Sequence, residues 1–330
     1  MKPGHRNLFI GPMSKNIVDA VIEHNSESKF QFGLIPSRRQ VETSKLGGGY
    51  VNSWTTESFS NYVGQTLVLR DHAGPGQGLL EDDGKVSLQS DIESGITFIH
   101  VDPWKKAKSI SSAADMTIEI IRLCNSGDCM FEIGTESAIY PYSVEQLAKF
   151  LQLVRSSLGS LFSKVTYCVT QSGTIVRETE NKGIFDADRS AKMCEVIHDF
   201  GLLAKEHNSD YLDENDFLVR SNSGVDSFNI APEFGVRETR KLIELLQGSD
   251  RMLEAFIEAS FRSNKWKKWV DENPSKMKAA EICGHYLFSS KEVMSLKMNL
   301  SQLLGFDVDV VLKNEAKQKL KSLENMGIWK

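Results

Sequence analysis

Short apolar runs recur along the chain, and each one ends in polar or glycine-rich residues. Eight segments fit this description: Leu8–Met13, Phe30–Pro36, Thr66–Arg70, Thr97–Asp102, Met130–Gly134, Val165–Thr170, Leu202–Lys205 and Phe228–Pro232. Most of the runs are continuously apolar and do not alternate with polar residues, which is typical of strands buried on both faces of a parallel sheet. The pattern therefore predicts eight buried strands.

Segments with helical spacing of apolar residues separate these runs. They include Ile17–Ile22, Ala114–Leu123, Val144–Leu158, Ala191–Phe200 and Arg237–Leu246. Strands that alternate with helices pair in parallel through crossover connections, and eight such units favour a closed (β/α)8 TIM barrel over an open doubly wound sheet. The predicted fold class is thus α/β.

We expect the barrel to span residues 1–248 and to carry the active site. Residues 249–330 are predicted to form a helical C-terminal extension that packs on the barrel. Within it, the segment Lys265–Trp269 is interpreted as part of a packed amphipathic helix, and Asn314–Glu324 as a final helix.

Composition excludes several classes of protein. The 330 residues carry a formal net charge of −5, which argues against electrostatic binding to nucleic acid or to anionic membranes. No apolar run approaches the ~18 residues of a membrane span, and the residues after Met1 lack the apolar stretch of a signal peptide. The five cysteines form no CxxC pair, so we expect reduced thiols in a cytoplasmic protein.

Candidate chemistry lies directly after the predicted strands, because the active sites of such barrels are built at the carboxyl ends of the strands. Asp71 and His72 follow the third strand, Glu136 the fifth, Gln171 the sixth and His207 the seventh. Two imidazoles and a carboxylate suit Zn, Mn or a similar ion, and Gln171 would add an oxygen ligand. Asp71 is the candidate base.

Other strand ends supply weaker candidates. Arg38 and Arg39 would hold a phosphate or another anion. Lys105 and Lys106 have the same chemistry, but we interpret them as solvated surface charges. His100 and Asp102 share one side of their strand and serve either the active site or the packing of the barrel. The other predicted substrate contacts are Ser172, Glu233 and Arg237.

The strand-end motifs, in this order, resemble a known family. They are Asp71-His72 followed by Gly74-Pro75, Ile99-His100 followed by Asp102, Ile133 to Glu136, Gln171 followed by Gly173, Glu206-His207 with Ser209 to Tyr211, and Pro232 with Arg237-Glu238. Taken together, they are similar to the larger subunit of the bacterial tagatose-bisphosphate aldolase system and to the related sugar 4-epimerases. Trp266 to Lys268 and His285-Tyr286 fall in the region expected for this family.

The resemblance implies a class II aldolase-like barrel, a divalent metal ion and carbon–carbon chemistry beside a carbonyl of a ketose or sugar phosphate. Zinc is the expected ion, with Mn and Mg as alternatives. Asp71 would be the base, with Glu136 and Asp102 as further catalytic residues, and the metal ligands would be His72, Glu136, Gln171 and His207. The positive charges of Arg38 and Arg39 suggest a more anionic or larger substrate than that of the aldolase subunit.

Four interpretations remain open at this stage. The chain is an aldolase that acts on a ketose phosphate or another anionic sugar, or a sugar or nucleotide-sugar 4-epimerase that uses the same retro-aldol step. A third interpretation is a non-catalytic subunit that stabilises a partner aldolase, and a fourth is an unrelated barrel enzyme without metal. We expect either a homo-oligomer or an assembly with a partner aldolase subunit.

Overall fold

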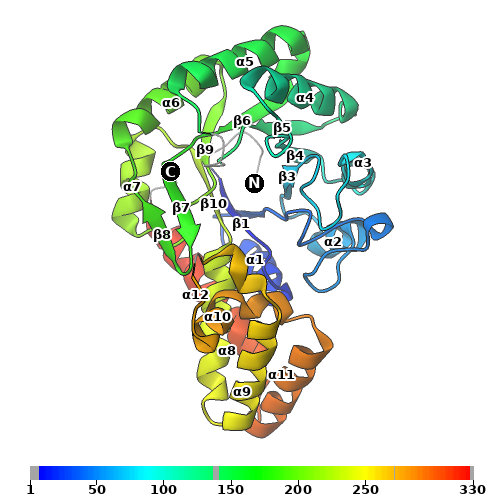
Figure 1. Cartoon of the computed structure of the whole chain (residues 1–330), viewed down its shortest axis with the longest axis vertical. Coiled ribbons are helices and arrows are strands. Elements are labelled where there is room, and N and C mark those ends of the chain that lie inside the picture. Colours follow the sequence, from blue (N-terminus) through cyan, green and yellow to red (C-terminus); the bar gives the residue numbers. More distant parts are fainter. Residues whose placement is uncertain (1–6, 137–140, 271, 328–330) are drawn as a thin grey trace.

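A ring of parallel strands forms the centre of the protein (Figure 1). The computed structural model describes residues 7–136, 141–270 and 272–327. Within these residues, one eight-stranded sheet has the order β2-β1-β10-β9-β6-β5-β4-β3. Its strands are β1 (Leu8–Ile10), β2 (Phe32–Leu34), β3 (Leu69–Ala73), β4 (Phe98–Val101), β5 (Met130–Ile133), β6 (Val165–Val169), β9 (Leu203–Glu206) and β10 (Ser227–Ile230).

The ring closes between β2 and β3. Two isolated parallel bridges, Leu34 with Val68 and Ser37 with Asp71, join these two edges of the sheet. All other neighbouring strands in the ring pair in parallel. Each of the eight predicted apolar runs overlaps one of these strands, so the predicted α/β barrel is confirmed.

Helices follow the strands around the outside of the ring. The helices of the barrel are α1 (Lys15–Glu27), α2 (Thr56–Val63), α3 (Lys85–Glu93), α4 (Ile110–Leu123), α5 (Val144–Leu158), α6 (Ala187–Asp199), α7 (Glu214–Asn222) and α8 (Pro232–Leu246). Ser14 caps α1, its hydroxyl accepting the backbone N–H of Ile17. The predicted helix from Arg237 in fact begins at Pro232, because proline suits a first helical turn, whose N–H groups lack partners.

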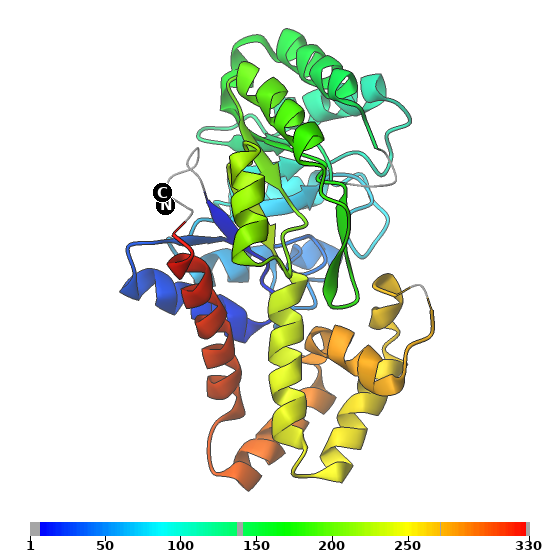
Figure 2. The ribbon, with the colours of Figure 1, turned by 90° about the vertical axis from the view of Figure 1, so that its left-hand side faces the viewer.

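The last helix, α12 (Val308–Asn325), packs directly on the barrel. It lies along α1 and α8 (Figure 2), and its residues Ala316, Leu320 and Leu323 are buried within the barrel's main hydrophobic core. Two ion pairs tie α12 to α8, one between Lys319 and Glu233 and one between Arg237 and Glu315. Burial of its apolar face makes α12 a structural part of the barrel wall.

The segments between α8 and α12 form a helical lobe with a second apolar core. The lobe contains α9 (Asp250–Arg262), the 3-10 helix η3 (Lys265–Lys268), α10 (Lys276–Cys283), the 3-10 helix η4 (Gly284–Leu287) and α11 (Lys291–Leu304). Leu242 and Leu246 of α8 share this second core with Phe256 of α9 and Val293 of α11. The predicted amphipathic helix over 265–269 is wrong: the segment is a single 3-10 turn in which Trp266 is buried.

A hairpin that the apolar pattern does not predict follows β6. It consists of β7 (Thr174–Arg177) and β8 (Glu180–Gly183), which pair antiparallel outside the barrel sheet. Its strands are short and mostly polar, so they lack the apolar run that marks the barrel strands. The hairpin reaches the lobe, where the guanidinium of Arg177 donates to the carbonyl of Lys268 at 3.0 Å (Figure 2).

All five cysteines are buried and unpaired, as predicted for thiols that serve as small apolar residues. Over the described ranges, no helix combines the length and the apolarity needed to cross a membrane.

The burial of α12 leads to a stability prediction. Leu320→Ala should lower the free energy of unfolding by about 2–5 kcal/mol, because Leu320 is fully buried and its truncation leaves a cavity. Met298→Ala on α11 is the control, since that side chain is 58% exposed and should cost less than about 0.5 kcal/mol. Urea denaturation followed by circular dichroism measures both. Equal, small effects would show that α12 is dispensable to the barrel.

Candidate active site

A bulge in β3 places Asp71 and His72 at the mouth of the barrel. Arg70 pairs with Ile99 and Ala73 with Val101, so two residues of β3 lie opposite one residue of β4. Neighbouring strand residues normally point to opposite faces, but a bulge bends the strand and reorients its side chains. His72 carries the positive φ of 45° that this geometry imposes.

Asp102, just after β4, fixes the orientation of His72. The Nδ1 of His72 lies 2.7 Å from Asp102 Oδ2, so Nδ1–H donates to this carboxylate. The opposite ring atom, Nε2, lies 3.2 Å from Glu136 Oε1 and 3.6 Å from Asp71 Oδ2. The imidazole of His72 therefore binds the Asp102 carboxylate through Nδ1, while two further carboxylates lie near its Nε2.

His207, which follows β9, is held in the same way by Glu132 of β5. Its Nε2 makes a short hydrogen bond to Glu132, whose other oxygen accepts from the buried Lys205 ammonium at 2.7 Å. The Nδ1 of His207 faces Glu136 Oε2 at 3.5 Å and Asp71 Oδ1 at 3.8 Å. The two histidines thus direct their free nitrogens towards the same pair of carboxylates.

His100 supports the bulge from inside the barrel and is fully buried. Its Nε2–H donates to the carbonyl of Gly134 at 2.9 Å, and its Nδ1 accepts the backbone N–H of His72 at 3.2 Å. That amide has no partner in the strand ladder because of the bulge. His100 is therefore a positioning residue for His72 in this structure.

The electrostatics of the cluster favour a cation between the side chains. Burial opposes a charge on His72, but the carboxylates of Asp71 and Glu136 and the hydrogen bond to Asp102 outweigh it and raise the pKa of His72 well above its ordinary value. Although burial acts in the opposite direction, the facing histidines, His72 first, lower the pKa values of Asp71 and Glu136 below their ordinary range.

A divalent metal ion fits this donor set. Glu136 Oε2 is buried and has no hydrogen-bond partner among the described residues. With neutral histidines, the only lysine or arginine that forms an ion pair with the carboxylates of Asp71, Asp102, Glu132 and Glu136, among the described residues, is Lys205, which leaves an excess of negative charge. The atoms of Asp71, His72 and His207 lie close enough together to share one ion. Histidine ligands that donate their other N–H to carboxylates are typical of metal centres.

The other predicted ligand and one predicted anion-binding residue have partners within the protein. Gln171 Oε1 accepts the backbone N–H of Tyr142 at 3.0 Å. Arg38 is 1% exposed, and four of its five N–H groups bind Glu42, Asp82 and the carbonyl of Gly74. Arg38 therefore anchors the loop after β3 and has little capacity left for a substrate.

Three predicted substrate contacts also take part in internal interactions. Glu233 accepts from the backbone N–H of Tyr211 and pairs with Lys319, while Arg237 pairs with Glu315. These contacts connect the end of the barrel to α12. The hydroxyl of Ser172 lies 3.0 Å from that of Thr174 at the base of the hairpin. Arg39, in contrast, is exposed after β2.

The predicted site residues include neither Lys205 nor Glu132. Both charges lie within otherwise apolar strands, which is the signal that would have revealed them. A charge in a strand buried on both faces needs a partner of opposite sign. The carboxylate of Glu132 and the ammonium of Lys205 satisfy each other across β5, β6 and β9.

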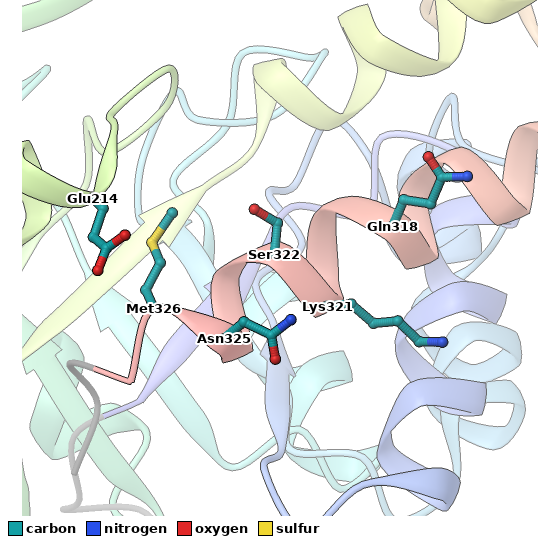
Figure 3. Close-up of a pocket in the computed structure, with 6 residues that line it drawn as sticks. All are labelled: Glu214, Gln318, Lys321, Ser322, Asn325 and Met326. Carbon is teal, nitrogen blue, oxygen red and sulfur yellow. The ribbon is translucent and has the colours of Figure 1, made fainter.

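A surface hollow elsewhere on the protein shows none of this chemistry. Figure 3 shows that it is lined by residues of α7 and of the end of α12, which are Glu214, Gln318, Lys321, Ser322, Asn325 and Met326. It contains no residue of the histidine–carboxylate cluster, so the strand-end cluster remains the candidate active site.

Comparisons with known proteins identify fold relatives. No family model matches the chain, and no curated protein matches it. Among solved structures, a probable tagatose 6-phosphate kinase from Sinorhizobium meliloti 1021 superposes with a TM-score of 0.74 at 17% identity, over 96% of this chain and 99% of that one.

Two further solved structures are similar over most of their length. The fructuronate–tagaturonate epimerase UxaE from Cohnella laeviribosi has a TM-score of 0.62 at 10% identity, over 98% of this chain and 82% of that one. A fructose-bisphosphate aldolase from Campylobacter jejuni has a TM-score of 0.55 at 12% identity, over 92% and 91%. At these identities the likeness shows a shared fold, and membership of the tagatose-bisphosphate aldolase family stays a prediction.

The loop after β9 carries a buried carboxyl group that makes stability depend on pH. Asp210 Oδ1 accepts the backbone N–H groups of Ala231 and Glu233, and burial raises the pKa of Asp210 to about 8. Because this folded-state pKa lies above the ordinary value of 3.8, the contribution of Asp210 to the free energy of unfolding is fully present at low pH. This contribution is lost as the pH rises towards 8.

Asp210→Asn keeps the accepting oxygen and removes the ionisation. We expect urea unfolding between pH 5 and pH 8 to show a smaller loss of stability in Asp210→Asn than in the wild type. Glu119→Gln, at an exposed position on α4, should follow the wild type. If the free energy of unfolding falls equally with pH in Asp210→Asn and in the wild type, Asp210 is not the source of the pH dependence.

Proposed function

We propose that this protein is a metal-dependent enzyme of carbohydrate metabolism that makes or breaks a carbon–carbon bond by aldol chemistry. The observation that carries the proposal is the pair of carboxylate-anchored histidines, His72 and His207, whose free nitrogens face Glu136 and Asp71. The substrate class is a ketose phosphate or another anionic sugar. The sugar-metabolising names of the fold relatives support this class.

His72, His207 and Glu136 would hold the metal ion, with zinc as the expected ion. A bound divalent cation supplies a Lewis acid for the carbonyl beside the bond that breaks. Asp102 and Glu132 keep the two imidazoles in the tautomers that expose a lone pair to the ion. Gln171 is not needed for this set, since its oxygen already accepts a backbone hydrogen bond.

Asp71 is the proposed base. Its lowered pKa keeps the carboxylate ionised at neutral pH, and its side chain is partly open to solvent at the mouth of the barrel. In the cleavage direction, Asp71 accepts the proton of a sugar hydroxyl as that oxygen becomes an aldehyde. The carbon–carbon bond breaks, and its electron pair moves to the fragment that carries the carbonyl, which becomes an enediolate.

Epimerisation at the same site is the second candidate. If the aldehyde stays bound, turns over and adds back, the product is a 4-epimer. One observation favours this outcome: the similarity to an epimerase extends over 98% of this chain.

The carboxylate that binds the other nitrogen of a ligand histidine should affect the metal affinity. Asp102→Asn should weaken zinc binding about 10–100-fold, because it removes the carboxylate that orients His72 and raises its basicity. Glu119→Gln on the surface of α4 is the matched loss of one carboxylate and should leave the affinity unchanged. Competition with a chromophoric chelator measures both, and an unchanged affinity in Asp102→Asn would exclude His72 from the ligand set.

The base assignment predicts a separation of metal binding from turnover. Asp71→Asn should lower turnover by about 10²–10⁴-fold and retain bound zinc. The assay incubates zinc-loaded protein with ketose bisphosphates and ketohexuronates and follows both aldehyde release and 4-epimer formation by NMR. A fully active Asp71→Asn variant would contradict the role of Asp71. A wild type without turnover would favour the non-catalytic subunit.

A further inference from the structure

A fully buried lysine lies inside the barrel, next to the candidate active site. Lys205 belongs to β9, and residues two apart along a strand point to the same face, so Lys205 shares the inner face of β9 with His207. Glu206 between them points outwards, where it pairs with Arg220 of α7 at 3.0 Å. The sequence Lys205-Glu206-His207 therefore directs one positive charge and one imidazole into the barrel.

The surroundings of Lys205 give its ammonium a defined position. The residue is aligned with Val169 of β6 and with Ser227 of β10, so its backbone is fixed on both sides by the sheet. The ammonium lies 3.9 Å from the centre of the Phe9 ring and 5.2 Å from the centre of the Tyr167 ring. Aromatic faces attract a cation. The charge is thus held between the aromatic interior of the barrel and the site.

Lys205 holds one of the two carboxylate oxygens of Glu132. Its ammonium donates to Oε2 at 2.7 Å, while Oε1 bonds to Nε2 of His207 and lies 4.0 Å from Nδ1 of His100. The Glu132 side chain cannot turn away from His207 without breaking a fully buried ion pair. Lys205 therefore determines which carboxylate oxygen faces the histidine.

The orientation of Glu132 sets the tautomer of His207. An ionised carboxylate only accepts hydrogen bonds, so it requires a proton on Nε2 of the neutral imidazole. The lone pair is then on Nδ1, the atom that faces Glu136 Oε2 at 3.5 Å and Asp71 Oδ1 at 3.8 Å. A proton on Nδ1 would prevent this atom from binding a metal ion.

The equivalent carboxylate of His72 is held without a charged donor. Asp102 accepts the backbone N–H of Trp104 at 3.2 Å and a side-chain N–H of Gln77 at 3.4 Å. Glu132 is fully buried and, in the part of the chain that the structure describes, accepts only from Lys205 and His207. The orientation of His207 therefore depends on one ammonium group.

Stability alone does not explain a charged pair in this place. Burial of an ion pair removes two charges from water, and apolar residues of similar volume are often as stable or more so. The neighbours Phe9 and Tyr167 belong to an apolar cluster in which such residues would pack well. The chain instead has a lysine whose only carboxylate partner bonds to a proposed metal ligand.

We propose that Lys205 is a positioning residue that acts through Glu132 and holds His207 in the tautomer whose Nδ1 receives the metal ion. The proposal rests on the proposed function, because it concerns how one ligand of the proposed metal site is presented. It adds a third residue to the pair Glu132 and His207, and this residue touches neither the metal ion nor the substrate.

Nitrogen-15 NMR of the histidine rings, recorded on metal-free protein in alkaline buffer, tests the proposal. In the wild type, His207 should carry its proton on Nε2. Lys205→Met should give a mixture of the two tautomers, because Glu132 is no longer held. Lys297→Met is the matched control, since Lys297 is 8% exposed and pairs with Asp309 between α11 and α12. It should leave the His207 signals unchanged.

Zinc affinity, measured by competition with a chromophoric chelator, is the second measurement. Lys205→Met should weaken zinc binding about tenfold, the lower end of the effect of residues that orient a ligand. The double variant Glu132→Gln/Lys205→Met provides a test even if Lys205→Met does not fold, because it leaves no buried charge unpaired. It should also show mixed tautomers and about tenfold weaker binding, since a neutral amide can donate as well as accept.

Two results would overturn the role of Lys205. One is a double variant that folds and keeps the proton of His207 on Nε2, or binds zinc as tightly as the wild type. The other is an equal change of the His207 signals in Lys297→Met and Lys205→Met. A wild type that binds no zinc would contradict the proposed function, whereas the tautomer measured without metal would still decide whether Lys205 positions His207.

Discussion

The candidate site depends on an excess of buried and half-buried carboxylates around two imidazoles. Asp71, Asp102, Glu132 and Glu136 surround His72 and His207, while Lys205 neutralises only one of the four. In a protein interior such an arrangement is unfavourable unless a cation completes it, either a proton on His72 or a metal ion. The strand bulge, the buried His100 and the two hydrogen-bonded tautomers all serve to present ligand atoms to that cation, which is why we regard the cluster as functional.

Much of the fold was predictable because barrel strands have a simple pattern. Each buried strand is a continuous apolar run, and its end marks the active-site face, so Asp71, His72, Glu136 and His207 could be placed near one another from sequence. The hairpin at Thr174 to Gly183 could not, since its short polar strands have no apolar pattern. The roles of Arg38, Glu233 and Arg237 were equally hidden, because charge alone does not reveal whether the partner is a substrate or another part of the chain.

The C-terminal residues serve the barrel in two places. α12 buries its apolar face in the barrel core, and the lobe between α8 and α12 contacts the β7–β8 hairpin, where the carbonyl of Lys268 accepts from the Arg177 guanidinium. Contacts of the hairpin and of Tyr50, Trp269 and Tyr286 join the lobe to the loops at the strand ends of the barrel.

Elemental analysis of zinc in the purified protein, after incubation with zinc and removal of the excess, tests the central claim most directly. The account predicts close to one zinc ion per chain in the wild type and in the surface control His198→Ala, and little in His72→Ala and His207→Ala. Wild-type protein that retains no metal under these conditions, or variants that retain as much as the wild type, would contradict the assignment of His72 and His207 as ligands.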